Sequence, residues 1–353
     1  MAETPFQRLT AEERRHALRT VQTEGPHPAF LFEKDIWVVA TLGVLFDAPF
    51  GQRLVFKGGT SLSKVWRAIR RFSEDLDITY DIRSFAPDLV ACAGVEALPS
   101  SRSQQKRWTK TIRSRLAEWV RETVGPLVQE QLGHAGFKAR IRAEAERLYV
   151  GYEPLFESFG AIRPEVQVDF GARSTGEPHA VRKVVCDAAA YLPGLAFPEA
   201  RPVVMLPERT FWEKSTAIHV YCHQGRRRGE RWSRHWHDIA RLDDAGIADS
   251  ALADRELALA VARHKEVFFR ENDSGGQRID YLAAVSGSLR LVPSSAALRV
   301  LANDYASMLG SGMLLDEDES FDALMDRCAR IEARANGRVA MAHANVPTGR
   351  EKP

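Results

Sequence analysis

The clearest chemical signal in the sequence is a pair of closely spaced acidic residues. Polar and apolar residues alternate in the run DLDITYD at residues 75–81, which predicts a strand with Asp75 and Asp77 on one face. Adjacent carboxylates repel each other and normally need a cation or a hydrogen-bond network. Because Mg²⁺ binds carboxylate and phosphate oxygens, the pair indicates a metal site. The alternative is an exposed edge strand whose acids discourage aggregation.

A turn suited to a phosphate group lies upstream of the acidic pair. Residues 54–56 (LVF) predict a short strand that leads into the run KGGTSLSK at residues 57–64, and residues 61–70 show a helical pattern. Backbone N–H groups and hydroxyls at such a turn bind anions. The run is not a Walker A loop, because no Gly-Lys-Ser/Thr closes it. Together, the turn and the acidic pair favour phosphoryl or nucleotidyl transfer, for which two metal ions would activate the attacking hydroxyl and stabilise the leaving pyrophosphate.

Two further residues are candidates for the same site. Asp169 lies on the polar face of a predicted strand in the run EVQVDF at residues 165–170, and we expect it to be a third metal ligand. Lys214 is three residues after Phe211 and four before Ile218, so it shares their inward stripe of a helix. A triphosphate would compensate this buried cation; the alternative is a lysine whose stem reaches along apolar surface to water.

Composition excludes several classes of protein. The chain has 353 residues, 49 Lys and Arg against 47 Asp and Glu, and 44% hydrophobic residues, which excludes whole-chain disorder. The longest apolar stretch, residues 36–46, is too short to span a membrane, and no secretory signal is visible, so we expect a cytoplasmic protein. The four cysteines are scattered and are expected to be reduced thiols.

Two basic runs stand out against this balanced charge. Residues 101–117 contain six basic residues and no acid, and residues 225–234 contain five basic residues and one acid. Such runs suit a polyanion, although a charged run is also an ordinary solvated helix face. The candidate RNA-binding residues within them are Lys106, Arg107, Lys110, Arg226, Arg227 and Arg228.

A group of histidines and one cysteine within residues 219–237 offers an alternative metal site. Its members are His219, Cys222, His223, His235 and His237. His219 and His223 are four residues apart, which is right for two ligands on one helix face, but the spacing of the group fits none of the usual zinc patterns. Packing, or orientation of a nucleotide by His235 or His237, is the preferred interpretation.

The sequence patterns predict an α+β protein with two domains. The first part mixes strands and helices, and nearly everything after Pro207 is helical in pattern. We expect a mixed sheet-and-helix domain at residues 1–200, a helical domain at residues 201–344 and a disordered tail at residues 345–353.

Four motifs, in this order and at these separations, resemble the AbiEii/AbiGii nucleotidyltransferase toxins of type IV toxin–antitoxin systems, to which the MenT toxins of mycobacteria belong. They are GGTSLSK from residue 58, RFSEDLDI from residue 71, PERTFWEK from residue 207 and RHWHD from residue 234. The resemblance covers most of the chain. It implies a polymerase-β-like nucleotidyltransferase fold followed by a mostly helical lobe, with an NTP as substrate and Mg²⁺ as cofactor.

The resemblance also implies roles for individual residues. Asp75 and Asp77 would bind Mg²⁺, and Lys214 and Asp238 would complete the catalytic site from the helical lobe. The nucleotide would be held by the turn and by a serine beside the acids; in some relatives this serine is phosphorylated as a silencing mark. These nucleotide-binding residues are Gly58, Gly59, Thr60, Ser61, Lys64 and Ser73, together with Lys214. Either Thr60 or Ser61 would supply the hydroxyl to the phosphate.

The expected function is therefore a toxin that transfers NMP from an NTP to an RNA acceptor and so blocks translation. The resemblance points to tRNA 3′ ends as the acceptor and to a cognate antitoxin as a protein partner; no membrane partner is expected. Transfer to a protein or small-molecule hydroxyl is an alternative within enzymes. A catalytically inactive module that binds RNA or the antitoxin is the alternative from another class.

Overall fold

The computed structural model describes residues 4–69, 71–157, 163–225, 231–310, 314 and 319–344. The chain folds as two compact units. Unit 1 comprises Met1–Arg67 and Phe72–Leu206, and unit 2 comprises Ala68–Arg71 and Pro207–Pro353. The predicted boundary between residues 200 and 201 lies close to the crossing at Leu206, but the short assignment of Ala68–Arg71 to unit 2 had no signal in the sequence. The basic residues Arg226–Arg228 and the predicted tail at 345–353 lie outside the described residues.

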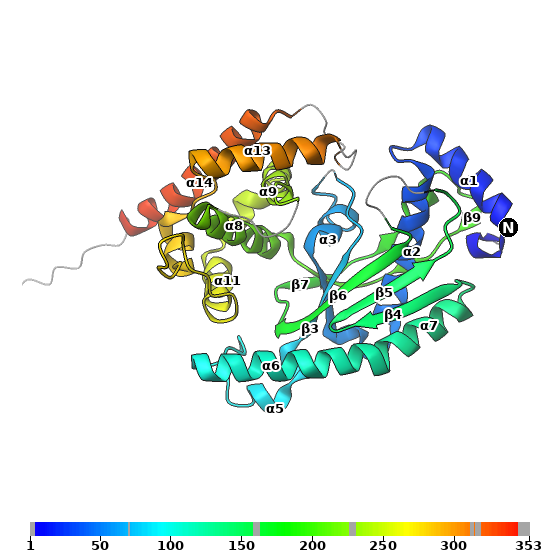
Figure 1. The fold of residues 1–353 in the computed structure, drawn as a ribbon, viewed down its shortest axis with the longest axis horizontal. Coiled ribbons are helices and arrows are strands. Elements are labelled where there is room, and N and C mark those ends of the chain that lie inside the picture. Colours follow the sequence, from blue (N-terminus) through cyan, green and yellow to red (C-terminus); the bar gives the residue numbers. More distant parts are fainter. Residues whose placement is uncertain are drawn as a thin grey trace, which may run out of the picture. The chain divides into compact units, whose positions relative to one another are not determined.

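Unit 1 is built on a mixed sheet of seven strands in the order β4-β5-β6-β3-β2-β11-β7 (Figure 1). β3 pairs with β6 in parallel and with β2 in antiparallel orientation, so it lies in the interior of the sheet. The strands are β2 (Leu54–Lys57), β3 (Leu76–Asp81), β4 (Ala139–Glu144), β5 (Arg147–Tyr152), β6 (Glu165–Ser174), β7 (His179–Val181) and β11 (Val203–Met205). Two short pairs lie outside this sheet, β1 (Thr4–Pro5) with β9 (Leu195–Ala196) and β8 (Val184–Val185) with β10 (Glu199–Ala200).

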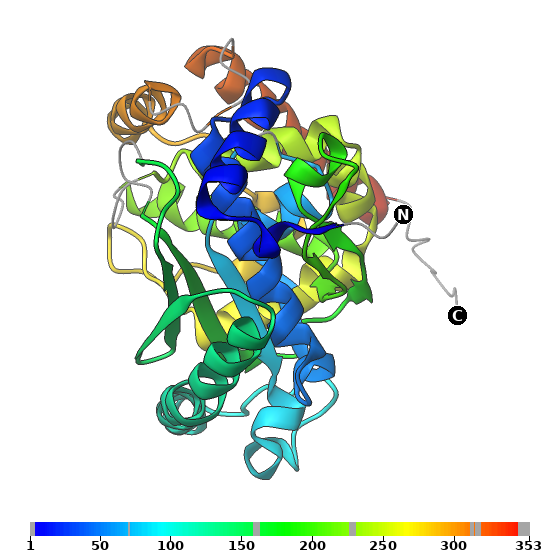
Figure 2. The ribbon, with the colours of Figure 1, turned by 90° about the vertical axis from the view of Figure 1, so that its right-hand side faces the viewer.

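Helices of unit 1 cover one face of the sheet. α6 and α7 follow one another along this face in Figure 1, α2 contacts β6 and α7, and α1 packs on α2 (Figure 2). The helices are α1 (Ala11–Glu24), α2 (Ala29–Asp47), α3 (Gly58–Lys64), α4 (Ile82–Phe85), α5 (Pro87–Val90), α6 (Arg102–Trp119) and α7 (Gly125–His134). A π-helical turn at Val120–Val124 joins α6 to α7.

Strand periodicity explains which face the helices cover. In β6, buried Val166, Val168, Phe170 and Ala172 alternate with half-buried residues. The ring of Trp119 on α6 packs against Tyr80 and Phe170 at centroid distances of 5.3 and 5.4 Å. These apolar side chains form the core between sheet and helices. The opposite face of the sheet, called the open face below, carries the polar residues of β3, β5 and β6.

Unit 2 is helical, as expected from the pattern after Pro207. α8 and α9 contact each other, and α14 packs on α9. Trp236 and Phe211 are fully buried in this bundle, and Trp236 Nε1 donates to Leu291 O at 2.7 Å. Its helices are α8 (Pro207–Gln224), α9 (Arg234–Asp244), α10 (Ile247–Ala253), α11 (Arg255–Phe268), α12 (Tyr281–Ala283), α13 (Ser295–Gly310) and α14 (Phe321–Ala344), with a π-helical turn at Ala284–Ser288. The α+β fold class is thus confirmed.

One predicted element is shorter than its sequence pattern indicated. The helix expected to continue to Arg70 ends at Lys64. Arg67 has a φ of +48°, outside the helical region, and Trp66 turns its indole to donate to Met205 O at 3.1 Å. Ala68 and Ile69, which lie within the predicted helix, are instead buried as part of unit 2.

No helix among the described residues is long and apolar enough to cross a bilayer. α2 is the most apolar helix, and sixteen of its residues are buried.

Candidate nucleotidyl-transfer site

Strand register brings the predicted acidic residues of unit 1 together on the open face. Asp77 pairs with Asp169 across the parallel β3–β6 ladder and with Lys57 across the antiparallel β2–β3 ladder. Paired residues share a face of the sheet, so Asp169 lies beside Asp77. Asp75 precedes β3 by one residue, and alternation along the strand directs it to the same face. Lys57 therefore lies on the same face of the sheet as Asp77 and Asp169. The sequence analysis treated it only as part of the turn.

The carboxylates on the open face crowd one another. Burial, followed by the charges of Glu74, Asp169 and Asp77, raises the pKa of Asp75 to about 6, while Lys34 acts in the opposite direction. Negative charge at this position is therefore disfavoured by its surroundings. A divalent cation between the carboxylates would remove that penalty, because it turns mutual repulsion into shared attraction.

Asp169 has other partners in this structure. Arg147 Nε donates to its Oδ1 at 2.6 Å, and Gln167 Nε2 donates to its Oδ2 at 2.7 Å. Among the residues that the structure describes, no group of three His, Cys, Asp or Glu side chains has the arrangement of a metal site. A Mg²⁺ ion at this position would have Asp75 and Asp77 as its protein ligands, and phosphate oxygens and water would complete its shell. Asp169 is held by Arg147 and Gln167 instead.

Gly58 at the start of α3 is fitted against Asp77. Its φ is +79°, and a Cβ atom built on it would lie 2.0 Å from Asp77 Oδ2 and 2.8 Å from Asp77 Cγ. The left-handed backbone and the close approach both require glycine. The turn therefore passes directly over the carboxylate, which places the start of α3 next to the acidic pair.

The hydroxyls of the turn bind it to the acidic segment. Thr60 Oγ1 donates to Asp75 O at 2.5 Å and lies 2.9 Å from Ser73 Oγ, and Ser61 Oγ donates to Gly58 O at 2.9 Å. Thr60 and Ser61 are completely buried, whereas Ser73 is partly exposed. In this structure both predicted phosphate-binding hydroxyls thus serve the internal geometry of the turn. Through its contact with Thr60, Ser73 belongs to the same group of hydrogen-bonded residues.

Buried charges on α2 hold the segments that carry the site. Lys34 Nζ forms an ion pair with Glu74 and donates to Arg163 O at 2.8 Å. Asp35 binds Lys64 Nζ at 2.6 Å, and Lys64 also reaches Asp187 Oδ1 at 2.8 Å. Lys64 is thus already engaged by two carboxylates, and a phosphate contact would compete with them. Sequence reasoning missed this arrangement; its signal is the charged triplet at residues 33–35 inside an otherwise apolar helix.

The predicted RNA-binding residues of α6 are on the protein surface. Lys106, Arg107 and Lys110 are exposed, while Trp108 and Ile112 of the same helix face the sheet. Farther along α6, Arg113 pairs with Glu146. Arg113 also lines a cavity of about 550 Å³ beside Asp169, together with Arg147 and Arg173 and with acidic residues of the β4–β5 turn.

Lys214 and Asp238 meet in a buried ion cluster of unit 2. Arg71 binds both carboxylate oxygens of Asp238, with Nε–Oδ1 and Nη2–Oδ2 distances of 2.7 and 2.8 Å, and Lys214 Nζ lies 2.8 Å from Oδ2. Although burial raises the pKa of Asp238, Arg71 and Lys214 hold it well below its usual range. Burial lowers the pKa of Lys214, and Asp238 opposes that shift. In this structure the anion beside the inward-facing Lys214 is Asp238; compensation by a triphosphate stays a prediction.

The alternative metal site in unit 2 is not assembled. His219 stacks on His223 with ring centroids 4.4 Å apart, and His219 Nδ1 accepts a hydrogen bond from Arg290 N at 3.1 Å. Burial lowers the pKa of His219 to about 4, so its neutral form accepts that bond. The described residues of this group form no metal-holding cluster.

Unit 1 thus carries a crowded pair of carboxylates beside a glycine turn on a mixed sheet, and a helical unit follows in the sequence. The sequence matches the family model described as nucleotidyl transferase AbiEii toxin, type IV TA system, over residues 42–327. The chain belongs to this family. The family implies an NTP substrate and an antitoxin as a partner.

Two solved structures are similar to this chain. JHP933 from Helicobacter pylori has 13% sequence identity and a TM-score of 0.42, and the match covers 88% of this chain and 94% of that protein. MenT4, a nucleotidyltransferase toxin from Mycobacterium tuberculosis H37Rv, has 16% identity and a TM-score of 0.38, with 94% and 99% covered. No curated protein matches the sequence significantly.

The contact between Gly58 and Asp77 predicts that Gly58→Ala damages activity more than folding. The added Cβ must push the carboxylate of Asp77 aside, and the left-handed backbone adds about 1 kcal/mol of strain. We expect nucleotidyl transfer to fall at least tenfold while the protein remains folded by circular dichroism. Gly246→Ala is the matched control, because Gly246 has a φ of +73° with nothing within 4 Å of its added Cβ. Equal activity of the two variants would contradict the assigned role.

The raised pKa of Asp75 predicts that Asp75→Asn stabilises the protein when divalent cations are removed. Because its folded-state pKa is about 6, ionisation of Asp75 lowers stability as the pH rises from about 4 through 6. The asparagine variant lacks this loss, so its free energy of unfolding at pH 7.5 in EDTA, measured by urea titration, should exceed that of the wild type by on the order of 1 kcal/mol. Added Mg²⁺ should raise the midpoint of the wild type only. A lower urea midpoint for Asp75→Asn than for the wild type in EDTA would show that the ionised Asp75 carboxylate does not destabilise the folded protein.

The ion cluster in unit 2 predicts a large loss of stability for Asp238→Ala. The change leaves Arg71 and Lys214 buried without their shared anion, and breaking a buried pair in this way costs about 3–5 kcal/mol. Urea unfolding measures the effect. Asp88→Ala removes the partner of Arg115 from an exposed ion pair and should change the midpoint little. Similar midpoints for the two variants would exclude a structural role of the cluster.

Proposed function

We propose that this protein transfers a nucleoside monophosphate from an NTP to an RNA hydroxyl, with Mg²⁺ as cofactor, and that tRNA 3′ ends are its acceptors. The acceptor oxygen forms a bond to the α-phosphorus as the bond to the β-phosphate oxygen breaks, so pyrophosphate leaves and the hydroxyl loses its proton. A blocked tRNA 3′ end cannot be aminoacylated, which would stop translation. The proposal places the reaction in the cytoplasm, where tRNA is used.

The contact of the glycine turn with the acidic pair is the observation that carries this proposal. Gly58 lies against Asp77, and Thr60 and Ser73 hydrogen-bond at the adjacent Asp75 segment. Asp75 and Asp77 would hold Mg²⁺, and Mg²⁺ supplies charge compensation for the triphosphate and a lower barrier to loss of pyrophosphate. The backbone from Gly58 through Gly59 would receive a phosphate beside these carboxylates. Asp169 would contribute once Arg147 moves to an incoming anion.

Surface charge on unit 1 supports a polyanionic acceptor. Lys106, Arg107 and Lys110 project from the exposed side of α6. Phosphate contacts of this kind give binding that weakens steeply with salt. We retain Arg226–Arg228 as RNA-binding candidates on the sequence alone.

Lys214 and Asp238 remain proposed functional residues on the basis of the family motifs. Within unit 2 they compensate each other's charge, so variants at either position need to be shown to fold before their activity is interpreted. Ser73 remains a proposed nucleotide contact and regulatory position.

Transfer of label from NTP to tRNA tests the function directly. Purified protein is incubated with total tRNA, Mg²⁺ and each α-³²P-labelled NTP in turn, and products are separated on a denaturing gel. We expect label in tRNA with one or two of the NTPs, and loss of more than 99% of it in Asp77→Asn. Asp81→Asn is the control, because Asp81 ends the same strand and is committed to Arg83.

Each other outcome of this assay assigns a different function. Label on protein instead of tRNA would overturn the RNA acceptor and favour transfer to a protein hydroxyl. Label on neither, with folded protein that still binds tRNA, would overturn catalysis and favour the binding module.

A further inference from the structure

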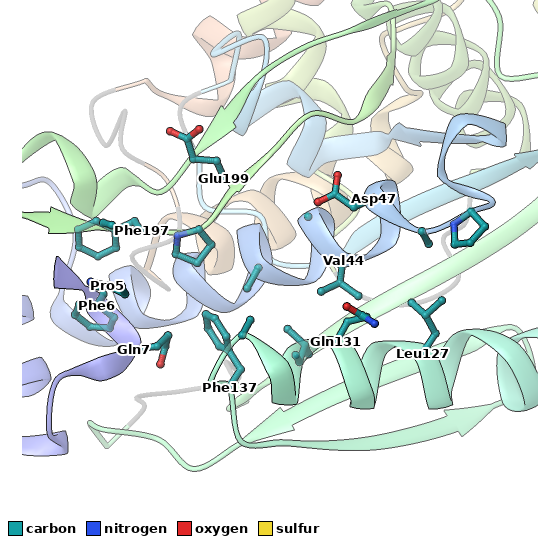
Figure 3. Close-up of a pocket in the computed structure, with 18 residues that line it drawn as sticks. Pro5, Phe6, Gln7, Val44, Asp47, Leu127, Gln131, Phe137, Phe197 and Glu199 are labelled. Atoms are coloured by element: carbon teal, nitrogen blue, oxygen red, sulfur yellow. The ribbon is translucent and has the colours of Figure 1, made fainter. Parts of the chain in front are cut away.

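A cavity of about 540 Å³ lies in unit 1 away from the acidic pair (Figure 3). α2 and α7 form two of its sides, and the N-terminal segment and residues 196–199 form the others. None of its lining residues belongs to β3, β6 or the turn at Gly58. The volume is within the range of small-molecule sites.

Aromatic contacts fix the walls of this cavity. The ring of Phe6 stacks on Phe197 with centroids 5.1 Å apart, and Phe137 packs edge-on against Trp37 at 4.9 Å. Gly43 allows the strand segment at Glu199 to approach α2, since a Cβ on Gly43 would lie 3.0 Å from Glu199 O. The cavity is thus preformed, so a ligand would not have to order it.

The ionisable side chains that line the cavity are acidic. Among the described residues that line it, Asp47 and Glu199 are the only ionisable ones and both are exposed, while the others are apolar apart from Gln7 and Gln131. In Figure 3 both carboxylates lie above the row of apolar side chains that includes Val44, Phe137 and Leu127. Glu199 pairs with Lys183 at 2.7 Å, but both side chains are about half exposed, so this pair is weak and readily exchanged.

We propose that this cavity binds a small organic cation with an apolar body and a single ammonium group. The apolar body would replace water against Val44, Leu127 and Phe137, and the ammonium group would lie between the carboxylates of Asp47 and Glu199. Neutral molecules with the same body would lose the ionic contact, and carboxylates would be repelled. The inference is independent of the reaction at the acidic pair.

Three phenylbutyl compounds that differ only in their polar group test the site. 4-Phenylbutylamine, 4-phenylbutanol and 4-phenylbutyrate are titrated into the full-length protein at low salt, with affinity measured by saturation-transfer NMR and calorimetry. We expect the amine to bind most tightly and the carboxylate least. Asp47→Asn should weaken the amine about two- to fivefold and leave the alcohol unchanged.

Val44→Trp fills the cavity from α2 and should weaken both the amine and the alcohol at least tenfold. Glu130→Gln on the exposed side of α7 is the matched charge control and should leave the amine affinity unchanged. Circular dichroism confirms the fold of each variant. Failure of the amine to bind, binding that persists in Val44→Trp, or equal affinity for the amine and the carboxylate would each overturn the proposal.

Discussion

Crowding of carboxylates on the open face is the constraint that shapes the candidate site of unit 1. Asp75, Asp77 and Asp169 are gathered by strand register, and the pKa of Asp75 is raised to about 6 by burial and by its acidic neighbours. Such a cluster lowers the stability of the protein that carries it. Under the proposed function, a divalent cation shared with a triphosphate would turn this repulsion into attraction and so offset the loss.

α2 supplies the rigidity that keeps these charges in place. Lys34 anchors Glu74, next to Asp75, and Asp35 anchors Lys64 at the end of α3. Lys34 and Asp35 are both buried. Because breaking a buried ion pair costs much free energy, these two pairs fix the positions of Glu74 and Lys64 relative to α2. Thr60 then joins α3 to the acidic segment through Asp75 O. Turn and strand therefore hold a fixed relationship before any substrate arrives, as preorganised electrostatic catalysis requires.

Periodicity made the main elements of the site predictable. The alternation in β3 and β6 placed Asp75, Asp77 and Asp169 on polar faces, and β3–β6 pairing then brought Asp169 next to Asp77. Sequence pattern alone gives neither strand order nor register, which is why the engagement of Asp169 by Arg147 was not foreseen. The hydrogen bond of Thr60 to Asp75 O and the pairing of Lys64 with Asp35 were missed for a similar reason, because each joins segments that are distant in the sequence. Likewise, the anion that compensates Lys214 proved to be Asp238 with Arg71 beside it, because tertiary packing decides which charges meet.

Binding of Mn²⁺, a spectroscopic substitute for Mg²⁺, tests the central claim that the β3 carboxylates form a divalent-cation site. The free Mn²⁺ signal in electron paramagnetic resonance is followed during titration with wild-type protein, Asp77→Asn and Asp81→Asn at pH 7.5 without nucleotide. The account predicts saturable binding by the wild type and by Asp81→Asn, and at least tenfold weaker binding by Asp77→Asn. Equal affinity of all three proteins would contradict it.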